Sequence, residues 1–212
     1  AESQSASVAT TIEDPFASLS LIAESAYVLD LTTDRVLYSK NPDSQLPLAS
    51  LVKVPLVLAA SEALKSDSIV TIPPHSTPDG AGIRLPAGLR FTTQDLIDFT
   101  LVASSNEGAV ILAEAAEAAL RIKYLLSTPG AATLWRMNDI AKNLGLTNMV
   151  FLNTHGLDLS DTQASAYASA HDVALLFGYA AKTTPTLFGQ TSQDTVKIRA
   201  TTGETVTGVN TD

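Results

Sequence analysis

The sequence predicts an α+β fold in which strands near both ends of the chain enclose a mainly helical middle. Segments rich in β-branched and aromatic residues, typical of strands, occur at 26–30, 35–38, 195–199 and 204–209. The residues between them favour helices, without the regular exchange of strand and helix that builds a parallel sheet. We therefore expect an antiparallel sheet built from the N- and C-terminal strands, packed against helices with a mainly helical subdomain.

Composition narrows the classes of protein to which the chain can belong. Its 212 residues suit one domain, placed at 18–212 behind a polar, flexible leader at 1–17. Thirteen basic and 22 acidic residues give a net charge of −9, which argues against nucleic acid as a partner and against a polybasic membrane contact. The absence of cysteine excludes disulfides, thiolate zinc sites and cysteine nucleophiles, and fits an exported protein.

The domain begins with a predicted hairpin, followed by a helix that carries the most informative residues of the chain. The hairpin strands are 26–30 and 35–38. Proline is tolerated in a helix only near its first turn, so Pro55 places the start of the next helix close to Ser50. Positions i and i+3 share a helix face, which brings the Lys53 ammonium to the Ser50 hydroxyl.

A serine beside a lysine can be a nucleophile beside its base. Lysine accepts the proton of a serine hydroxyl if burial or nearby positive charge holds its amine neutral. The backbone N–H groups at the start of the helix also favour negative charge on the Ser50 oxygen. The alternative is structural: Ser50 caps the helix and Lys53 is solvated.

The middle of the chain is predicted to be mostly helical. Residues 69–92 are rich in Pro and Gly and favour loops with short strands at most. Thr93 and Ser169 are placed to cap helices, and Gly145 is placed to end one. Helices are expected, in chain order, at 94–102, 107–120, 131–144 and 170–181.

A second polar motif, Ser104-Ser105-Asn106, interrupts the helical pattern between two of these helices. Such a break can direct polar side chains into a cleft. The alternative is that Ser105 or Asn106 only caps the helix that follows. Both interpretations remain open from the residues alone.

Other polar residues are given structural roles. His155 lies beside Gly156 and is expected in a turn, and no His-Glu-x-x-His pattern predicts a metal site. Glu114 and Glu117 lie one helical turn apart and are expected to face water.

Ser50-x-x-Lys53, followed about fifty residues later by Ser104-x-Asn106, resembles the serine penicillin-recognising enzymes. Within that group the chain is most similar to the D-alanyl-D-alanine carboxypeptidases, the low-molecular-weight penicillin-binding proteins. The similarity extends from about residue 20 to the end of the chain. The segments that carry it are 26–53 and 101–109, which contain the two motifs, and 137–146, 151–157 and 167–172.

The resemblance implies the β-lactamase/transpeptidase-like fold and a mechanism. Ser50 would attack the carbonyl between two D-alanines and form an acyl-enzyme, and Lys53 would take the Ser50 proton. Ser104 would relay a proton to the departing amine, and Asn106 would hold Lys53 and the substrate amide. Water would then release the shortened peptide. No metal or organic cofactor is implied.

The resemblance also implies partners and a location. The substrate would be a peptidoglycan peptide ending in D-Ala-D-Ala, with β-lactam antibiotics as covalent inhibitors. The protein would be exported to the periplasmic or extracellular side of the cell wall. Any membrane contact would come from segments outside residues 1–212.

One family motif, Lys-Thr-Gly, does not occur in the chain. Thr201-Thr202-Gly203 has its last two residues but not the lysine. We therefore expect the C-terminal strands to be incomplete and the 212-residue chain to have weak or no activity. A non-catalytic binding or scaffold relative of the same fold is the alternative. A class A β-lactamase is a lesser one, because no suitably placed glutamate loop follows Ser104-x-Asn106.

Overall fold

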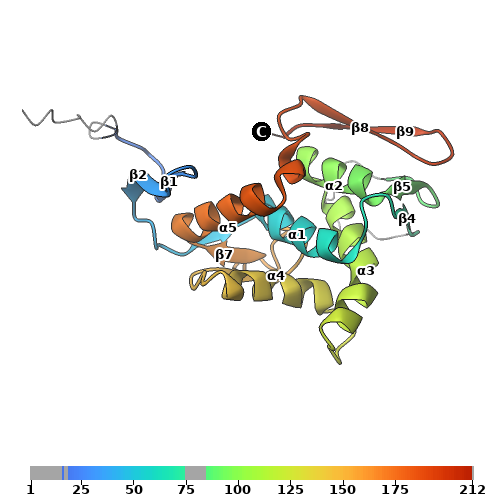
Figure 1. Cartoon of the computed structure of the whole chain (residues 1–212), viewed down its shortest axis with the longest axis horizontal. Coiled ribbons are helices and arrows are strands. Elements are labelled where there is room, and N and C mark those ends of the chain that lie inside the picture. The colour runs from blue at the N-terminus through green and yellow to red at the C-terminus, as the bar shows by residue number, and fades with distance from the viewer. Residues whose placement is uncertain (1–15, 17–18, 75–84, 212) are drawn as a thin grey trace, which may run out of the picture.

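The computed structural model describes residues 16, 19–74 and 85–211. A central group of helices separates two hairpins, β1–β2 at one end of the molecule and β8–β9 at the other (Figure 1). The elements in chain order are β1 (Ala26–Asp30), β2 (Arg35–Lys40), β3 (Leu46–Leu48), the 3-10 helix η1 (Ser50–Val52), α1 (Lys53–Ala63), β4 (Ile69–Thr71), β5 (Arg90–Thr92), α2 (Thr93–Val102), α3 (Asn106–Lys123), α4 (Ala132–Asn143), β6 (Val150–Phe151), β7 (Ala166–Ala168), α5 (Ala170–Thr183), the 3-10 helix η2 (Pro185–Phe188), β8 (Thr195–Arg199) and β9 (Thr205–Val209).

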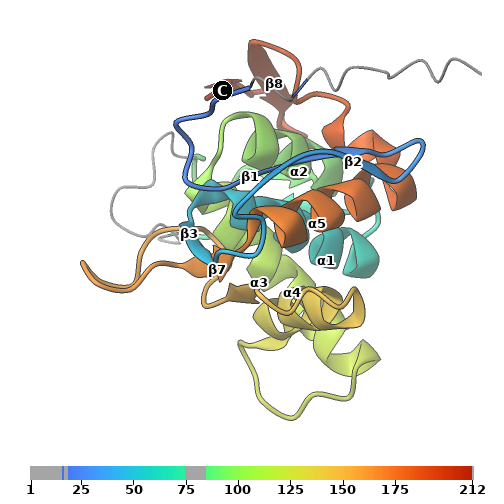
Figure 2. The same ribbon diagram turned by 90° about the vertical axis from the view of Figure 1, so that its left-hand side faces the viewer.

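Helix α1 is the centre of the hydrophobic core. Every residue from Lys53 to Ala60 is buried, as expected for a helix that is apolar on all sides. It packs against α2, α3, α4 and α5, which surround it in both ribbon views (Figures 1 and 2). Lys53 is the only charged side chain that α1 places in this core, so the first turn of α1 carries a cation into an apolar environment.

The α+β class is confirmed, but the strands at the two ends of the chain do not share a sheet. Among the described residues, β1 pairs only with β2, and β8 pairs only with β9. The prediction of one sheet built from N- and C-terminal strands is therefore wrong for this part of the chain. Each hairpin packs on a different helix, β1 on α5 and β8 with β9 on α2, which holds them at opposite ends.

A three-stranded sheet that the sequence did not predict lies near the start of α1. Its order is β3-β7-β6, with antiparallel pairing throughout. The strands are only two or three residues long, too short for alternation of apolar and polar residues to be visible. This sheet supports the chain that leads into Ser50, because β3 ends at Leu48.

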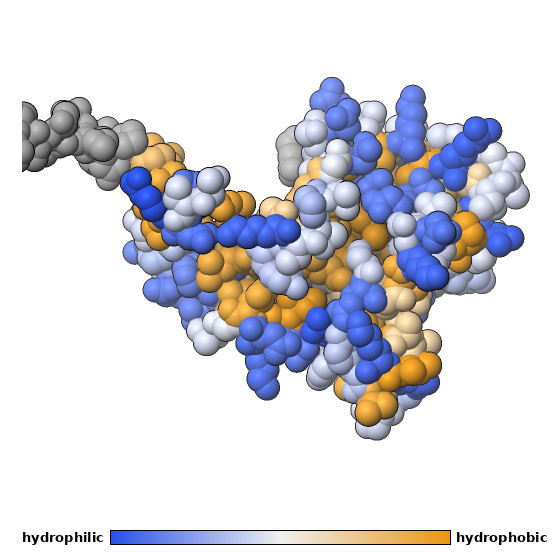
Figure 3. Space-filling model, in the orientation of Figure 1, coloured by the Kyte–Doolittle hydropathy of each residue, from blue (hydrophilic) through white to orange (hydrophobic). Residues whose placement is uncertain are grey.

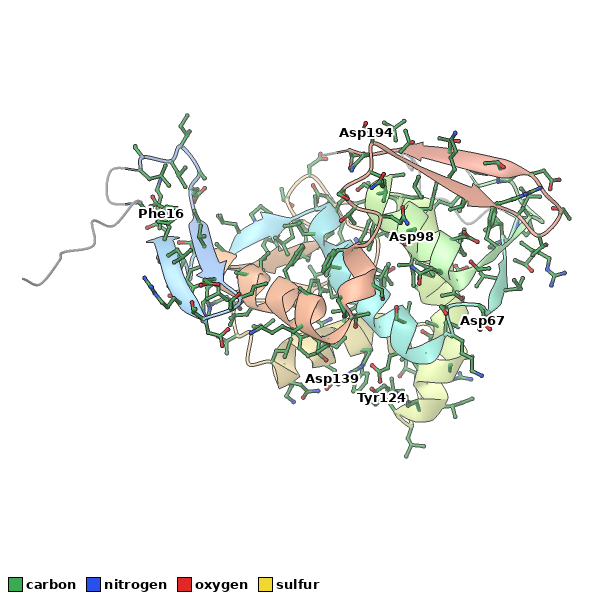
Figure 4. All side chains as sticks on the ribbon, turned by 45° about the horizontal axis from the view of Figure 1, so that its top comes forward. Phe16, Asp67, Asp98, Tyr124, Asp139 and Asp194 are labelled. Atoms are coloured by element: carbon green, nitrogen blue, oxygen red, sulfur yellow. The ribbon has the colours of Figure 1, made fainter. Side chains whose placement is uncertain are left out.

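The helix boundaries follow the sequence with small corrections. Thr92, rather than Thr93, caps α2, and its side chain forms a capping box with Asp95. Ser169 caps α5 as predicted, and Gly145, with φ +75°, follows the C-cap of α4. The predicted leader at 1–17 lies outside the described residues except for Phe16, whose ring lies against Tyr38 of β2 (Figure 4).

Glu117 does not simply face water, because it closes the start of α4. Its carboxylate accepts hydrogen bonds from the backbone N–H groups of Gly130 at 2.7 Å and Ala132 at 2.9 Å. The residue that precedes α4, Ala131, provides no side-chain cap of its own. Glu114, one turn earlier on α3, is exposed as predicted. Within the described ranges, no helix combines the length and the apolar character needed to cross a bilayer.

Candidate active site

Ser50 and Lys53 occupy the first positions of two successive helical segments. Ser50 begins η1 and Lys53 begins α1, so the two side chains lie one turn apart. Lys53 Nζ lies 2.9 Å from Ser50 Oγ. The alternative of a solvated lysine is excluded, because Lys53 is only 2% exposed. Ser50 makes no side-chain cap either, since the residue at the N-cap of η1 is Ala49.

The break between α2 and α3 brings the second motif to the first. Ser104 Oγ donates a hydrogen bond of 2.7 Å to Ser50 Oγ, and Asn106 Oδ1 accepts one of 2.8 Å from Lys53 Nζ. Ser104 has φ +49°, a left-handed conformation that is unfavourable for a residue with a side chain. The middle residue, Ser105, is the helix cap, and its Oγ accepts from Gly108 N. The motif therefore caps α3 and also delivers two side chains to Ser50.

A third contact comes from the turn that contains His155. The backbone carbonyl oxygen of His155 accepts a hydrogen bond of 2.9 Å from Lys53 Nζ. The turn itself was predicted, but its contact with Lys53 was not. A backbone carbonyl has no residue-type signature, so only the resemblance of segment 151–157 to the family pointed to this part of the chain.

The environment of Lys53 favours its neutral form. Its three partners are a hydroxyl, an amide and a backbone carbonyl, and none of them carries a negative charge. Burial therefore lowers the pKa of Lys53 from 10.5 to about 8. Burial, followed by the charge of Lys53, also lowers the pKa of His155. At neutral pH most of Lys53 is therefore still charged, but its neutral fraction is far larger than that of an ordinary lysine.

Ser50 opens onto a cavity of about 440 Å³ that is accessible from the surface. Its lining is mainly apolar, with Leu51, Leu101, Phe177 and Phe188 beside the polar pair of Ser50 and Ser104. Apolar surface is visible in the hollow between the two hairpins (Figure 3). The cavity is large enough for a small peptide or a compact ring system.

Other polar clusters lie away from this cavity. Glu62, Arg136 and Asp139 form an ion-pair network beside Tyr124, on the opposite side of the molecule from β8–β9 (Figure 4). Thr201-Thr202-Gly203 forms the turn of the β8–β9 hairpin, where Thr201 N bonds Arg90 O, and does not line the cavity. No group of three or more potential metal ligands occurs among the described residues.

The fold is that of the low-molecular-weight penicillin-binding proteins. A solved structure of D-alanyl-D-alanine carboxypeptidase from Mycobacterium tuberculosis H37Rv superposes with a TM-score of 0.73 at 27% identity, over 90% of this chain and 67% of that one. The sequence pattern of the D-alanyl-D-alanine carboxypeptidase family, Peptidase_S11, matches residues 9–211. The chain therefore belongs to this family.

Two curated proteins with different names are similar to the chain in sequence. The chain is 31% identical over 160 residues to the D-alanyl-D-alanine carboxypeptidase DacF of Bacillus subtilis, covering 73% of this chain and 38% of that protein. It is 30% identical over 173 residues to the D-alanyl-D-alanine endopeptidase of Pseudomonas aeruginosa, covering 76% of this chain and 52% of that protein. The chain thus spans about half, or less, of the length of these relatives.

Proposed function

We propose that the protein is a serine-type D-alanyl-D-alanine carboxypeptidase that acts on peptidoglycan stem peptides through an acyl-enzyme on Ser50. One observation carries the proposal: Lys53 is buried, has no anionic partner and lies 2.9 Å from Ser50 Oγ. A lysine in this state can accept a proton at neutral pH. Membership of the carboxypeptidase family supports the choice of reaction.

The hydrogen bonds around Lys53 explain how it would act as the base. A neutral amine has two N–H donors and one lone pair. If the donors remain on Asn106 Oδ1 and His155 O, the lone pair faces the Ser50 hydroxyl. Ser50 would transfer its proton to Lys53 Nζ as its oxygen attacks the carbonyl carbon of the penultimate D-alanine.

Ser104 is placed to complete the acyl transfer. Its hydroxyl contacts Ser50 Oγ at 2.7 Å, so it can pass a proton from the Lys53 side to the amine of the departing D-alanine. Backbone N–H groups at the start of η1, including that of Ser50, would stabilise the tetrahedral oxyanion. In the hydrolysis step, water would attack the acyl carbonyl carbon as Lys53 takes its proton, and that proton would pass to Ser50 Oγ as the ester bond breaks and the shortened peptide leaves.

The site contains no Lys-Thr-Gly, and we expect residues 1–212 alone to release D-alanine weakly or not at all. A penicillin-binding module without turnover is the second candidate function, which this absence favours.

We also propose an exported location at the cell wall, where the substrate occurs, and β-lactams as covalent inhibitors.

Intact mass spectrometry after incubation with a labelled penicillin tests the nucleophile. One adduct is expected on the unaltered protein and on S61A, a serine variant at the other end of α1 that lies outside the site. No adduct is expected on S50A, and an adduct that persists there would refute the assignment.

A parallel assay of D-alanine release distinguishes enzyme from binding module. Peptides ending in D-Ala-D-Ala should be compared with cross-linked peptides, using residues 1–212 and a longer chain that includes a Lys-Thr-Gly segment. Release of D-alanine by the longer chain supports the carboxypeptidase. Adduct formation without release, in both chains, would support the binding module.

A further inference from the structure

The side chain of Asn153 makes three of the hydrogen bonds that close the turn from Asn153 to Leu157, and Leu157 N donates a further one of 3.2 Å to His155 Nδ1. Asn153 Oδ1 accepts hydrogen bonds from His155 N at 3.1 Å and from Gly156 N at 2.9 Å. Its Nδ2 donates to Leu157 O at 2.7 Å. A single side-chain amide thus binds backbone groups of three following residues. Removing the amide would remove all three hydrogen bonds.

The same turn contacts the nucleophile segment from two directions. The His155 carbonyl accepts from Lys53 Nζ. Gly156 is buried, with φ +91°, and a Cβ there would lie 2.8 Å from Ala49 O and 3.2 Å from Ser50 N. The backbone of Gly156 therefore packs directly on the peptide that joins Ala49 to Ser50, and no other residue fits at this position without displacing it.

The start of the turn is attached to the rest of the fold by hydrogen bonds that do not involve the side chain of Asn153. The backbone N–H groups of Leu152 and Asn153 both donate to Ser165 O, and Ser165 Oγ donates to Leu48 O at the end of β3. The start of the turn is thus fixed to the β3-β7-β6 sheet. Its tip, which carries His155 and Gly156, is held by the Asn153 amide and by the single bond from Leu157 N to His155 Nδ1.

We infer that Asn153 is a positioning residue for the candidate nucleophile: by holding this turn closed, it keeps the His155 carbonyl on Lys53 and Gly156 against the Ser50 backbone. The inference rests on the proposed function. Asn153 does not touch Ser50 or Lys53 itself and acts through its two neighbours. Opening the turn would free one Lys53 N–H and admit water beside the ammonium, which favours the charged form.

Two matched pairs of variants test this. N153A removes three hydrogen bonds to backbone groups. N138A also removes three, one to Leu134 O within α4 and two to the backbone of Phe151 in β6. G156A places a methyl group against the Ala49–Ser50 peptide. G145A adds the same methyl at φ +75°, where nothing lies within 4 Å. The second member of each pair controls for lost stability.

Two readouts are measured for every variant: the pKa of Lys53 by NMR of labelled lysine, and the rate of acylation by a fluorescent penicillin between pH 6 and pH 10. In N153A and G156A we expect a higher pKa for Lys53 and acylation at neutral pH slowed by about 10-fold or more, since small displacements of reacting groups are costly. In N138A and G145A we expect an unchanged pKa and a rate within about threefold of the unaltered protein.

The outcomes separate this inference from the proposed function. Failure of acylation both in residues 1–212 and in the longer chain that includes a Lys-Thr-Gly segment contradicts the proposed function, while the pKa comparison still decides the role of Asn153. If N153A keeps both the pKa of Lys53 and the acylation rate, the inference is wrong. Equal effects in N153A and N138A also overturn it, because they would show a general loss of stability.

Discussion

Lys53 and Asn106 lie 53 residues apart in the sequence, and Lys53 Nζ donates a hydrogen bond of 2.8 Å to Asn106 Oδ1. The amide oxygen satisfies a donor of the buried ammonium without adding a negative charge. A carboxylate at the same position would favour the charged lysine and raise its pKa. The amide at the start of α3 therefore helps to keep the pKa of Lys53 low.

The cost of burying Lys53 predicts how stability depends on pH. The folded-state pKa of about 8 lies below the ordinary value of 10.5, so between these values the unfolded chain binds a proton that the folded chain has released. The free energy of unfolding should therefore rise with pH across this range, by about 3 kcal/mol relative to K53M. Urea unfolding of both proteins from pH 7 to pH 10.5 measures the difference. Parallel curves would show that Lys53 titrates normally.

Adjacent serines of the second motif should have separable roles. S104A removes the hydroxyl bonded to Ser50 and should slow acylation by about 100-fold, because a proton relay is lost. S105A removes the cap of α3 and should cost about 1 kcal/mol of stability with a smaller effect on rate. Penicillin acylation rates and thermal unfolding of both variants provide the comparison. Similar rates for the two would argue against a relay through Ser104.

The left-handed backbone of Ser104 gives a further test with glycine. S104G and S104A both lack the hydroxyl, but glycine adopts φ +49° without strain. We expect S104G to be more stable than S104A by about 1 kcal/mol, with equally slow acylation. Higher stability of S104G would show that the backbone of Ser104 is strained and that this strain accompanies the placement of its hydroxyl beside Ser50. A glycine variant that is no more stable would mean that the backbone relaxes here.

Two buried threonines of α2 should respond in opposite ways to valine. Thr100 Oγ1 is the only buried side-chain polar atom without a hydrogen-bond partner in the part of the chain that the structure describes. T100V removes this unpaired hydroxyl and should stabilise the protein by about 1 kcal/mol. Thr93 is equally buried, but its hydroxyl donates to Ser68 O, so T93V should cost about 1 kcal/mol. Chemical denaturation distinguishes the two, and a loss of stability in T100V would indicate an unseen partner.

Glu117 and Glu114 form a matched pair on α3. E117A removes the carboxylate that closes the start of α4 and should destabilise the protein by about 1 to 2 kcal/mol. E114A removes an exposed carboxylate and should change stability by less than about 0.5 kcal/mol. Melting temperatures at neutral pH suffice for the comparison. Equal melting temperatures for E117A and E114A would mean that the hydrogen bonds of Glu117 contribute little to stability.

The parts of the fold and site that depend on local sequence were predictable. Pro55 fixed the start of the helix, and the spacing of three residues then placed Lys53 beside Ser50, as the structure confirms. The break before α3 was equally visible, since Ser104 to Asn106 interrupt two helical runs. The joining of the two motifs came only from the resemblance to a family, because no local rule connects segments 54 residues apart.

The parts that depend on long-range packing were missed. Glu117 was assigned to solvent because its helical position is peripheral, yet the carboxylate meets the N-terminus of a helix that begins 15 residues later. The two terminal hairpins were joined in one sheet because both have strand-like composition, which does not reveal that each packs on a different helix. The His155 carbonyl could not be found from residue type at all.

The central claim is that burial makes the Lys53 amine, which lies beside the Ser50 hydroxyl, much easier to deprotonate than an ordinary lysine. Titration of Lys53 by NMR in protein with labelled lysine, assigned by the K53R variant, measures this directly. We predict a pKa of about 8 for Lys53. A value near 10.5, the ordinary lysine value, would contradict the account, because the amine would then be protonated at every pH at which the protein is expected to act.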